Sequence, residues 1–85
     1  MVSMELMRRQ ATIQARLARA PGGPVTELPD RPLVRVRAVY GRALATTPTH
    51  VLHEWVKGGQ HFARWDEKWQ VQRVTDDEWD GEGFE

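Results

Sequence analysis

Three histidines and one glutamate are the side chains in this 85-residue chain whose types and spacing come closest to a metal site. His50, His53, Glu54 and His61 all fall within the segment THVLHEWVKGGQHFARW, residues 49–65. On an extended strand, residues three apart point to opposite faces, so His50 and His53 do not converge on one ion unless the strand begins after His50. The sequence has no cysteine and no helical H-E-x-x-H pattern that would add ligands. We therefore expect strand-edge or surface histidines, with no metal and no cofactor.

Catalytic motifs are also missing from the sequence. It contains neither the G-x-S-x-G pattern of a nucleophile nor a phosphate-binding P-loop, and Gly58-Gly59 lacks the flanking spacing of a nucleotide loop. A chain of this length forms one domain at most and buries only about 60% of the surface of its unfolded form. We therefore expect a small non-enzymatic protein.

Arginines and a tyrosine form a second group of interest. Arg35 and Arg37 alternate with apolar residues, and Tyr40 and Arg42 follow them. Small barrels use basic strand faces with an aromatic neighbour to bind the phosphates and bases of nucleic acids. The other interpretation is that these arginines are simply solvated, and the net charge of zero differs from the positive excess typical of nucleic-acid-binding proteins.

The C-terminal segment TDDEWDGEGFE, residues 75–85, combines six carboxylates with two aromatic rings. On composition it should be disordered when isolated, and it fits a solvating tail. It also fits a docking segment, in which the carboxylates steer the tail to a basic surface and Trp79 and Phe84 act as anchors. Such a tail could cover the basic strand face as an internal competitor. Trp79 favours docking, because a solvating tail has no need of a tryptophan.

Charge is divided unevenly along the chain. Residues 1–42 hold eight arginines against three acidic side chains, whereas residues 43–85 hold four basic and nine acidic side chains. The two halves therefore face each other or face different partners. No apolar run is long enough to span a bilayer, and the N-terminus lacks the apolar core of a signal peptide, so we expect a cytoplasmic protein without a membrane partner.

Strong helix formers predict a helix over residues 4–20, with Ser3 as its N-cap. Its narrow apolar stripe consists of Leu6, Ile13, Leu17 and Ala20. A helix of this length is marginal alone, so it must dock on the β domain, pair with a copy of itself in a homo-oligomer, or lie on a partner. The following Pro and Gly residues end it.

Strand patterns fill the middle of the chain. Alternation predicts one strand over residues 33–40, a loop over 41–48, a hairpin over 49–65 and a last strand over 69–74. Three of the four tryptophans lie in or just after the hairpin, so we expect the core to be built there.

The register of the hairpin decides which of its faces is buried. A two-residue turn at Gly58-Gly59 or a four-residue loop places Trp55 opposite Phe62 and Leu52 opposite Trp65, whereas a three-residue loop shifts the pairing by one residue. We favour the former, because it pairs large aromatic side chains across the strands.

The order of a strand, a long loop, a central hairpin, a turn and a short closing strand is similar to SH3-like small barrels. The sequence thus predicts a mainly β protein with one N-terminal helix, either such a barrel or a bent antiparallel sheet of four to five strands. Its expected parts are a helical arm (1–20), a Pro/Gly linker (21–32), the β domain (33–74) and the acidic tail (75–85).

Function follows as two hypotheses. The first is an accessory or regulatory subunit that binds another protein through exposed aromatic residues, among them Trp55, through the helix stripe or through the tail. The alternative is a nucleic-acid-binding regulator that uses the basic strand face covered by its tail.

Overall fold

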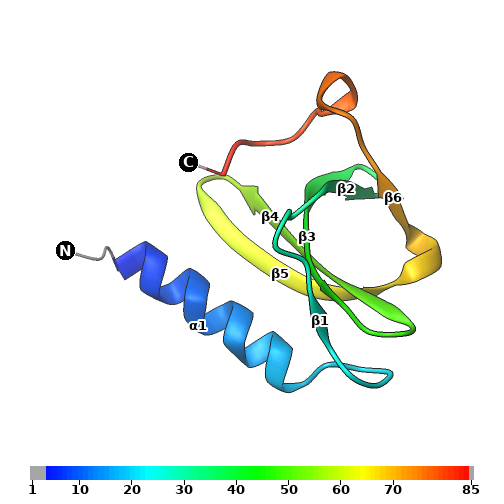
Figure 1. The fold of residues 1–85 in the computed structure, drawn as a ribbon. Coiled ribbons are helices and arrows are strands. Elements are labelled where there is room, and N and C mark those ends of the chain that lie inside the picture. Colours follow the sequence, from blue (N-terminus) through cyan, green and yellow to red (C-terminus); the bar gives the residue numbers. More distant parts are fainter. Residues whose placement is uncertain (1–3, 85) are drawn as a thin grey trace.

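The computed structural model describes residues 4–84 as a strongly bent antiparallel sheet with one helix (Figure 1). The helix is α1 (Met4–Ala18), and the strands are β1 (Thr26–Glu27), β2 (Leu33–Val36), β3 (Val39–Thr46), β4 (His50–Lys57), β5 (Gln60–Glu67) and β6 (Val71–Arg73). Two 3₁₀ turns, η1 (Lys68–Gln70) and η2 (Asp76–Glu78), flank β6.

The sheet has the strand order β5-β4-β3-β2-β6, with β1 paired to β3 beside β2. The mainly β fold with one helix is confirmed. The sheet is not closed, because β5 and β6 remain its two edges, so the SH3-like barrel is not confirmed. The described residues form six strands rather than four to five, and β1 lies within the segment predicted as a linker.

The prediction of a single strand over residues 33–40 followed by a loop over 41–48 was wrong. The chain reverses at Arg37, whose φ of 56° is left-handed, and β3 then continues through the predicted loop to Thr46. Gly41 belongs inside this strand for a steric reason. A Cβ at this position would lie 1.9 Å from the carbonyl oxygen of Glu54, so only glycine lets β3 and β4 approach here.

The favoured hairpin register is confirmed. Leu52 pairs with Trp65 and Trp55 pairs with Phe62. Gly58 and Gly59 form the two-residue turn with φ values of 60° and 75°, which glycine adopts without a steric penalty.

Aliphatic residues, not tryptophans, build the core. One buried cluster contains Leu44, Ala45, Leu52 and Ala63, and a second contains Val34, Ala43 and Val51. The last strand begins only at Val71, since residues 68–70 form η1, and this turn leaves Trp69 77% exposed. The expected tryptophan core was therefore wrong, although Trp65 packs at the edge of the first cluster.

Helix α1 lies outside the curve of the sheet, and we call this side the convex face and the opposite side the concave face (Figure 1). Ile13 and Leu17 pack against the first core cluster. Arg16 Nε donates to the carbonyl of Ala63 at 2.9 Å, and Trp65 Nε1 donates to the carbonyl of Arg16 at 2.7 Å. The C-terminal half of the helix therefore docks on the sheet of its own chain, which is one of the three docking sites expected for the apolar stripe.

Two sequence predictions about α1 have different outcomes. The helix ends at Ala18, two residues earlier than predicted. The predicted N-cap, Ser3, lies outside the described residues.

Within residues 4–84, no helix has the length and apolar character that a membrane span requires.

Candidate binding site on the convex face

The convex face carries a fully buried carboxylate, Glu54, in the middle of β4. Arg9 from α1 donates to it through Nη2 at 2.8 Å and through Nε at 3.3 Å. His61 from β5 donates through Nε2 at 2.7 Å. A buried charge is tolerated only when it is paired and hydrogen-bonded, and here both oxygens are. The Glu54 network therefore ties the N-terminal half of α1 to the hairpin.

The tail folds back over this face. After β6, η2 is closed by a capping box in which Thr75 and Glu78 bond reciprocally. Trp79 then packs edge-on against Tyr40 of β3, with ring centroids 5.8 Å apart. At Gly81 a Cβ would lie 2.7 Å from the Cβ of Tyr40, so the chain passes directly over this tyrosine. The acidic tail is thus seated on the sheet.

The end of the tail makes two further contacts. The carboxylate of Glu82 accepts hydrogen bonds from the amides of Gly58 and Gly59, at 3.0 and 2.9 Å. Successive amides in a turn of this kind form a concavity that binds anions. The ring of Phe84 lies 4.2 Å from the guanidinium carbon of Arg42 and 5.9 Å from that of Arg9. The tail is therefore anchored at three points by an aromatic ring, a carboxylate and a second ring.

A cavity of about 650 Å³ opens between α1, the hairpin and the end of the tail. Its wall includes Leu6, Arg8, Val56, His61 and Phe84. The Nδ1 atom of His61 is buried and has no hydrogen-bond partner among the described residues. Because the tail supplies one wall, departure of the tail would open this cavity.

The structure brings together four of the seven binding residues predicted from the sequence. Tyr40 and Arg42 meet Trp79 and Phe84 on the convex face. Arg37 is exposed in the β2–β3 turn, and Arg35 donates to its carbonyl at 2.9 Å.

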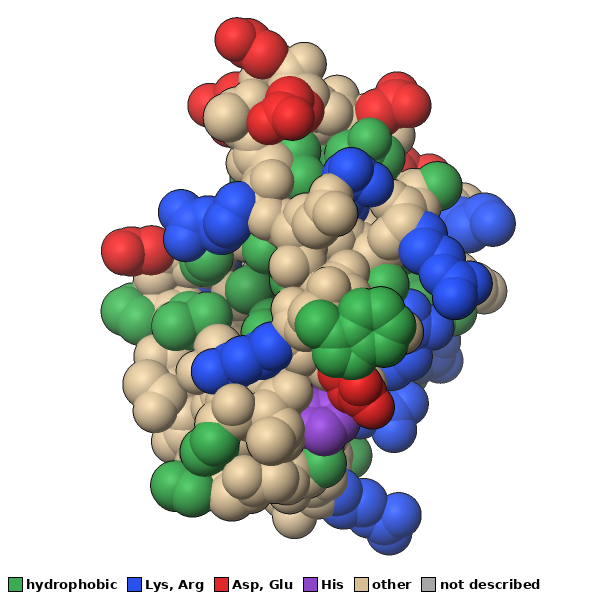
Figure 2. All heavy atoms as spheres, turned by 90° about the vertical axis from the view of Figure 1, so that its right-hand side faces the viewer, with side chains coloured by type: hydrophobic (Ala, Val, Ile, Leu, Met, Phe, Trp, Pro, Cys, Tyr) green, Lys and Arg blue, Asp and Glu red, His purple; other side chains and the backbone are tan. Residues whose placement is uncertain are grey.

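Arg35 still belongs to the electrostatics of the site. Hydrogen bonds from the backbone and side chain of Thr75 lower the pKa of Glu78, and the positive charge of Arg35 lowers it further. In Figure 2 acidic side chains gather at the top of the molecule, where the tail lies, with basic side chains below them.

Trp55 lies apart from the other predicted residues, on the concave face. Its ring stacks on Phe62 at 5.6 Å and 17°, and the guanidinium of Arg64 lies 5.2 Å from it. The ring of His53 lies 4.9 Å away on the same face. Burial lowers the pKa of His53, and the negative charge of Asp66 opposes that effect.

Sequence reasoning missed Arg9, Glu54, His61 and Glu82 as parts of this site. One signal was present for Glu54, which alternates with Leu52 and Val56 on a strand face that packs against α1. A carboxylate in such a row requires a cationic partner. Nothing in the sequence indicates that this partner is Arg9, because 45 residues separate the two.

Comparisons with protein family models, with curated protein sequences and with solved structures give no significant match. Among the side chains that the structure describes, no three of histidine, aspartate or glutamate gather in a way that could hold a metal ion. The chemistry of the site therefore rests on its own geometry, which joins cationic side chains, aromatic rings and the Gly58 and Gly59 turn amides that bind a carboxylate.

Proposed function

We propose that this protein is a non-enzymatic interaction module, an accessory or regulatory subunit that binds an acidic and aromatic segment of a partner protein. The observation that carries the proposal is the tail itself. Its Trp79 ring packs on Tyr40, and its Phe84 ring lies against the guanidinium of Arg42. Between these two contacts, Glu82 accepts hydrogen bonds from the Gly58 and Gly59 amides. The convex face thus already accommodates one segment of the chemistry that the partner would present.

The spacing of the three anchors defines the partner's motif. It reads aromatic-x-x-acidic-x-aromatic, because two residues separate Trp79 from Glu82 and one separates Glu82 from Phe84. Ring-on-ring packing selects the first position, paired amide donors select a carboxylate, and the Arg42 guanidinium selects a ring at the last. A segment with the same composition in another order would satisfy one anchor at a time.

The tail is suited to be displaced. A single aromatic pair contributes about 0.5–1.5 kcal/mol and an exposed cation–π contact about 0.5–1 kcal/mol, so closure of the tail is weak. The tail nevertheless competes with a free partner because it is covalently attached, and a tethered segment has an effective concentration in the millimolar range. A partner that carries the same motif with additional contacts would replace it.

The second candidate is a single-stranded nucleic acid. The acidic turn η2 lies close enough to Arg35 for the arginine's charge to lower the pKa of Glu78, so carboxylates stand where phosphates would bind. Arg9 and Arg42 flank an aromatic ring, as they would flank a base.

The test uses the full chain with its tail anchors removed, as the variant Trp79→Ala/Phe84→Ala. A fluorescein-labelled peptide of residues 75–84 should bind this variant, by anisotropy, at least tenfold more tightly than it binds the wild type. The control peptide keeps every carboxylate but carries alanine at both aromatic positions, and it should not bind. Arg42→Ala added to the variant should weaken binding of the first peptide.

Two results would overturn the proposal. Equal binding of both peptides would mean that charge alone is recognised. Binding of a labelled oligonucleotide, with a steep loss of affinity in salt and none for the peptide, would establish the nucleic-acid candidate instead.

A further inference from the structure

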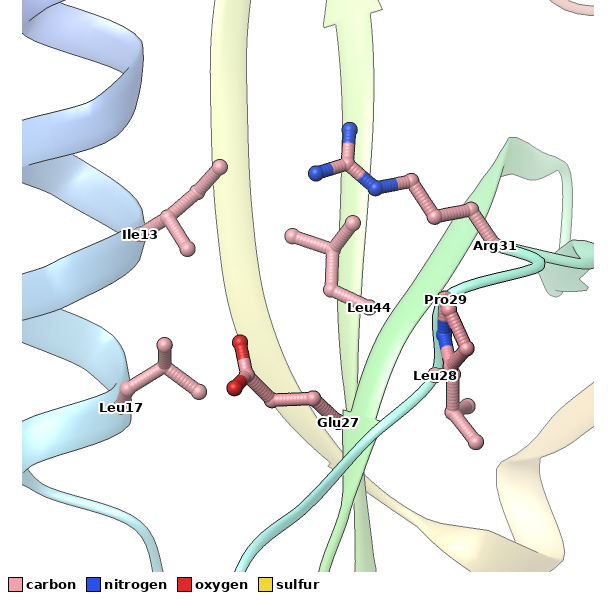
Figure 3. A pocket seen from close by; sticks show the side chains of 7 residues that line it. All are labelled: Ile13, Leu17, Glu27, Leu28, Pro29, Arg31 and Leu44. Atoms are coloured by element: carbon pink, nitrogen blue, oxygen red, sulfur yellow. The ribbon is translucent and has the colours of Figure 1, made fainter.

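A second cavity, of about 290 Å³, lies at the other end of the convex face, between α1 and residues 27–31 (Figure 3). Its apolar lining comes from Ile13, Leu17, Leu28 and Leu44. Leu44 occupies the bulge in β3, where the register shifts between Ala43 and Ala45. The site described above uses none of these residues.

Two opposite charges stand over this apolar lining. The side chains of Glu27 and Arg31 both extend toward α1, one on either side of Leu44 (Figure 3). Within residues 4–84, neither side chain makes a hydrogen bond or an ion pair. Both are exposed, so their charges are available to a ligand that enters the cavity.

The backbone at Arg31 adds an independent observation. Its φ of 45° is left-handed, which costs a residue other than glycine about 1–2 kcal/mol. The Arg31 amide donates to the carbonyl of Leu28 at 3.1 Å, and Pro29 and Pro32 flank the turn. Glycine would relieve the strain, yet the chain places a long cation here, aimed over the cavity. Strained residues of this kind are concentrated at ligand sites.

We propose that this cavity binds a free α-amino acid with a branched apolar side chain, such as leucine or isoleucine. The cavity lies at the lower end of the size range of small-molecule sites, which suits about nine non-hydrogen atoms. Arg31 binds the α-carboxylate, Glu27 binds the α-ammonium, and the side chain packs on Leu44 between Ile13 and Leu17. This site is separate from the peptide site, so either can fail without the other.

The pairing of charges sets this ligand apart from simpler ones. A short fatty acid would need Arg31 alone, and an aliphatic amine would need Glu27 alone. A zwitterion satisfies both and adds no net charge to the protein. Glycine has both charges but lacks the side chain that would fill the apolar part.

The experiment titrates the full-length protein with L-leucine and follows the backbone amide resonances of Glu27, Leu28, Asp30 and Arg31. Shifts should saturate with leucine. 4-Methylpentanoate, which lacks the ammonium, 3-methylbutylamine, which lacks the carboxylate, and glycine should each bind about tenfold more weakly or not at all. Equal binding of leucine and 4-methylpentanoate would overturn the proposal, as would the absence of saturable shifts with leucine.

Variants separate the binding role from a structural one. Glu27→Gln and Arg31→Gln should each weaken leucine binding about tenfold. The matched control is Arg37→Gln, which changes the other left-handed arginine, in the β2–β3 turn, and should leave binding unchanged. Arg31→Gly should raise the melting temperature, because it relieves the backbone, and still lose leucine binding. Retained binding in Arg31→Gly would assign Arg31 a purely structural role and overturn the proposal.

Discussion

His53 and Glu54 are neighbours on β4, both fully buried, and the protein accommodates them in opposite ways. Glu54 faces α1 and accepts three hydrogen bonds from two basic side chains. His53 faces the concave side, and neither of its ring nitrogens has a hydrogen-bond partner among the described residues. Its Nδ1 atom lies 3.4 Å from Asp66 Oδ2, an ion-pair distance without hydrogen-bond geometry.

The difference shows that buried polar side chains have different roles on the two faces of the sheet. On the convex face, buried charge attaches separate segments, since Glu54 holds the helix while Arg9 and Arg42 also contact the ring of Phe84. On the concave face, a neutral ring fills space beside Trp55 and against Gly41. A segment that is held by charged side chains can be displaced by a competing ligand, whereas a ring packed in the interior cannot. The four predictions below test this contrast.

Removal of Arg9 should have the largest effect. Arg9→Met leaves Glu54 buried with His61 alone, and loss of one partner of a buried pair costs about 3–5 kcal/mol. Because the Arg9 side chain keeps 23% of its exposure, we expect about 3 kcal/mol, measured by urea unfolding at neutral pH. Arg8→Met, on the exposed neighbour, is the control and should change stability by less than about 0.5 kcal/mol.

A double variant sharpens this result. Glu54→Gln added to Arg9→Met removes the uncompensated charge and should recover part of the lost stability. If the single and double variants unfold at the same urea concentration, the Glu54 network does not hold the helix by charge.

Gly41→Ala should have the next largest effect, because the added methyl group would collide with both Glu54 and His53. The new Cβ would lie 1.9 Å from the Glu54 carbonyl oxygen and 2.6 Å from His53 Nε2. Overpacking of this kind costs about 1–3 kcal/mol. Gly83→Ala is the matched control, since a Cβ there meets no atom within 4 Å. Equal melting temperatures for the two variants would contradict the close approach of β3 and β4.

The His53 side chain should make stability fall in mildly acidic solution. Burial lowers its pKa in the folded protein below the ordinary value of 6.5, against the opposing charges of Asp66 and Glu54 and together with that of Arg64. Below about pH 6.5 the unfolded chain therefore binds more protons than the folded chain, and the free energy of unfolding decreases as pH falls. Above that pH the contribution is constant.

Comparison of two histidine variants checks the assignment. His53→Gln should flatten the decrease in unfolding free energy between pH 6.5 and 5, measured by urea titration at each pH. His50→Gln, at a half-buried histidine bonded to Thr49, should keep it. An unchanged slope in His53→Gln would mean that another group titrates.

Local signals in the sequence predicted the helix, the hairpin and its register, because helix formers and paired glycines act within a few residues. The division of residues 33–48 was not predictable in this way. The reversal at Arg37 uses a left-handed arginine, which propensity disfavours, and Gly41 reads as a loop residue until β4 lies against it.

The candidate site was half predictable. Trp79 and Phe84 stood out because aromatic rings in an acidic tail have no solvating purpose, and Tyr40 and Arg42 stood out beside the alternating arginines. Their partners were not predictable, since Glu82 binds turn amides 23 and 24 residues away. Such contacts follow from tertiary structure, in which the tail crosses the sheet to reach the hairpin.

Phe84→Leu should have the smallest effect, and it tests the contacts on the convex face that a competing ligand could replace. The change keeps apolar volume but removes the cation–π contact with Arg42, which is worth about 0.5–1 kcal/mol. Global stability should hardly move, because the core clusters lie elsewhere. The tail should open more often, so hydrogen exchange at the Gly58 and Gly59 amides, which donate to Glu82, should rise about two- to fivefold. Phe62→Leu on the concave face should leave that exchange unchanged. Equal exchange in wild type and Phe84→Leu would mean that Glu82 holds the turn without help from the ring, and the partner's motif would then need no aromatic residue at its last position.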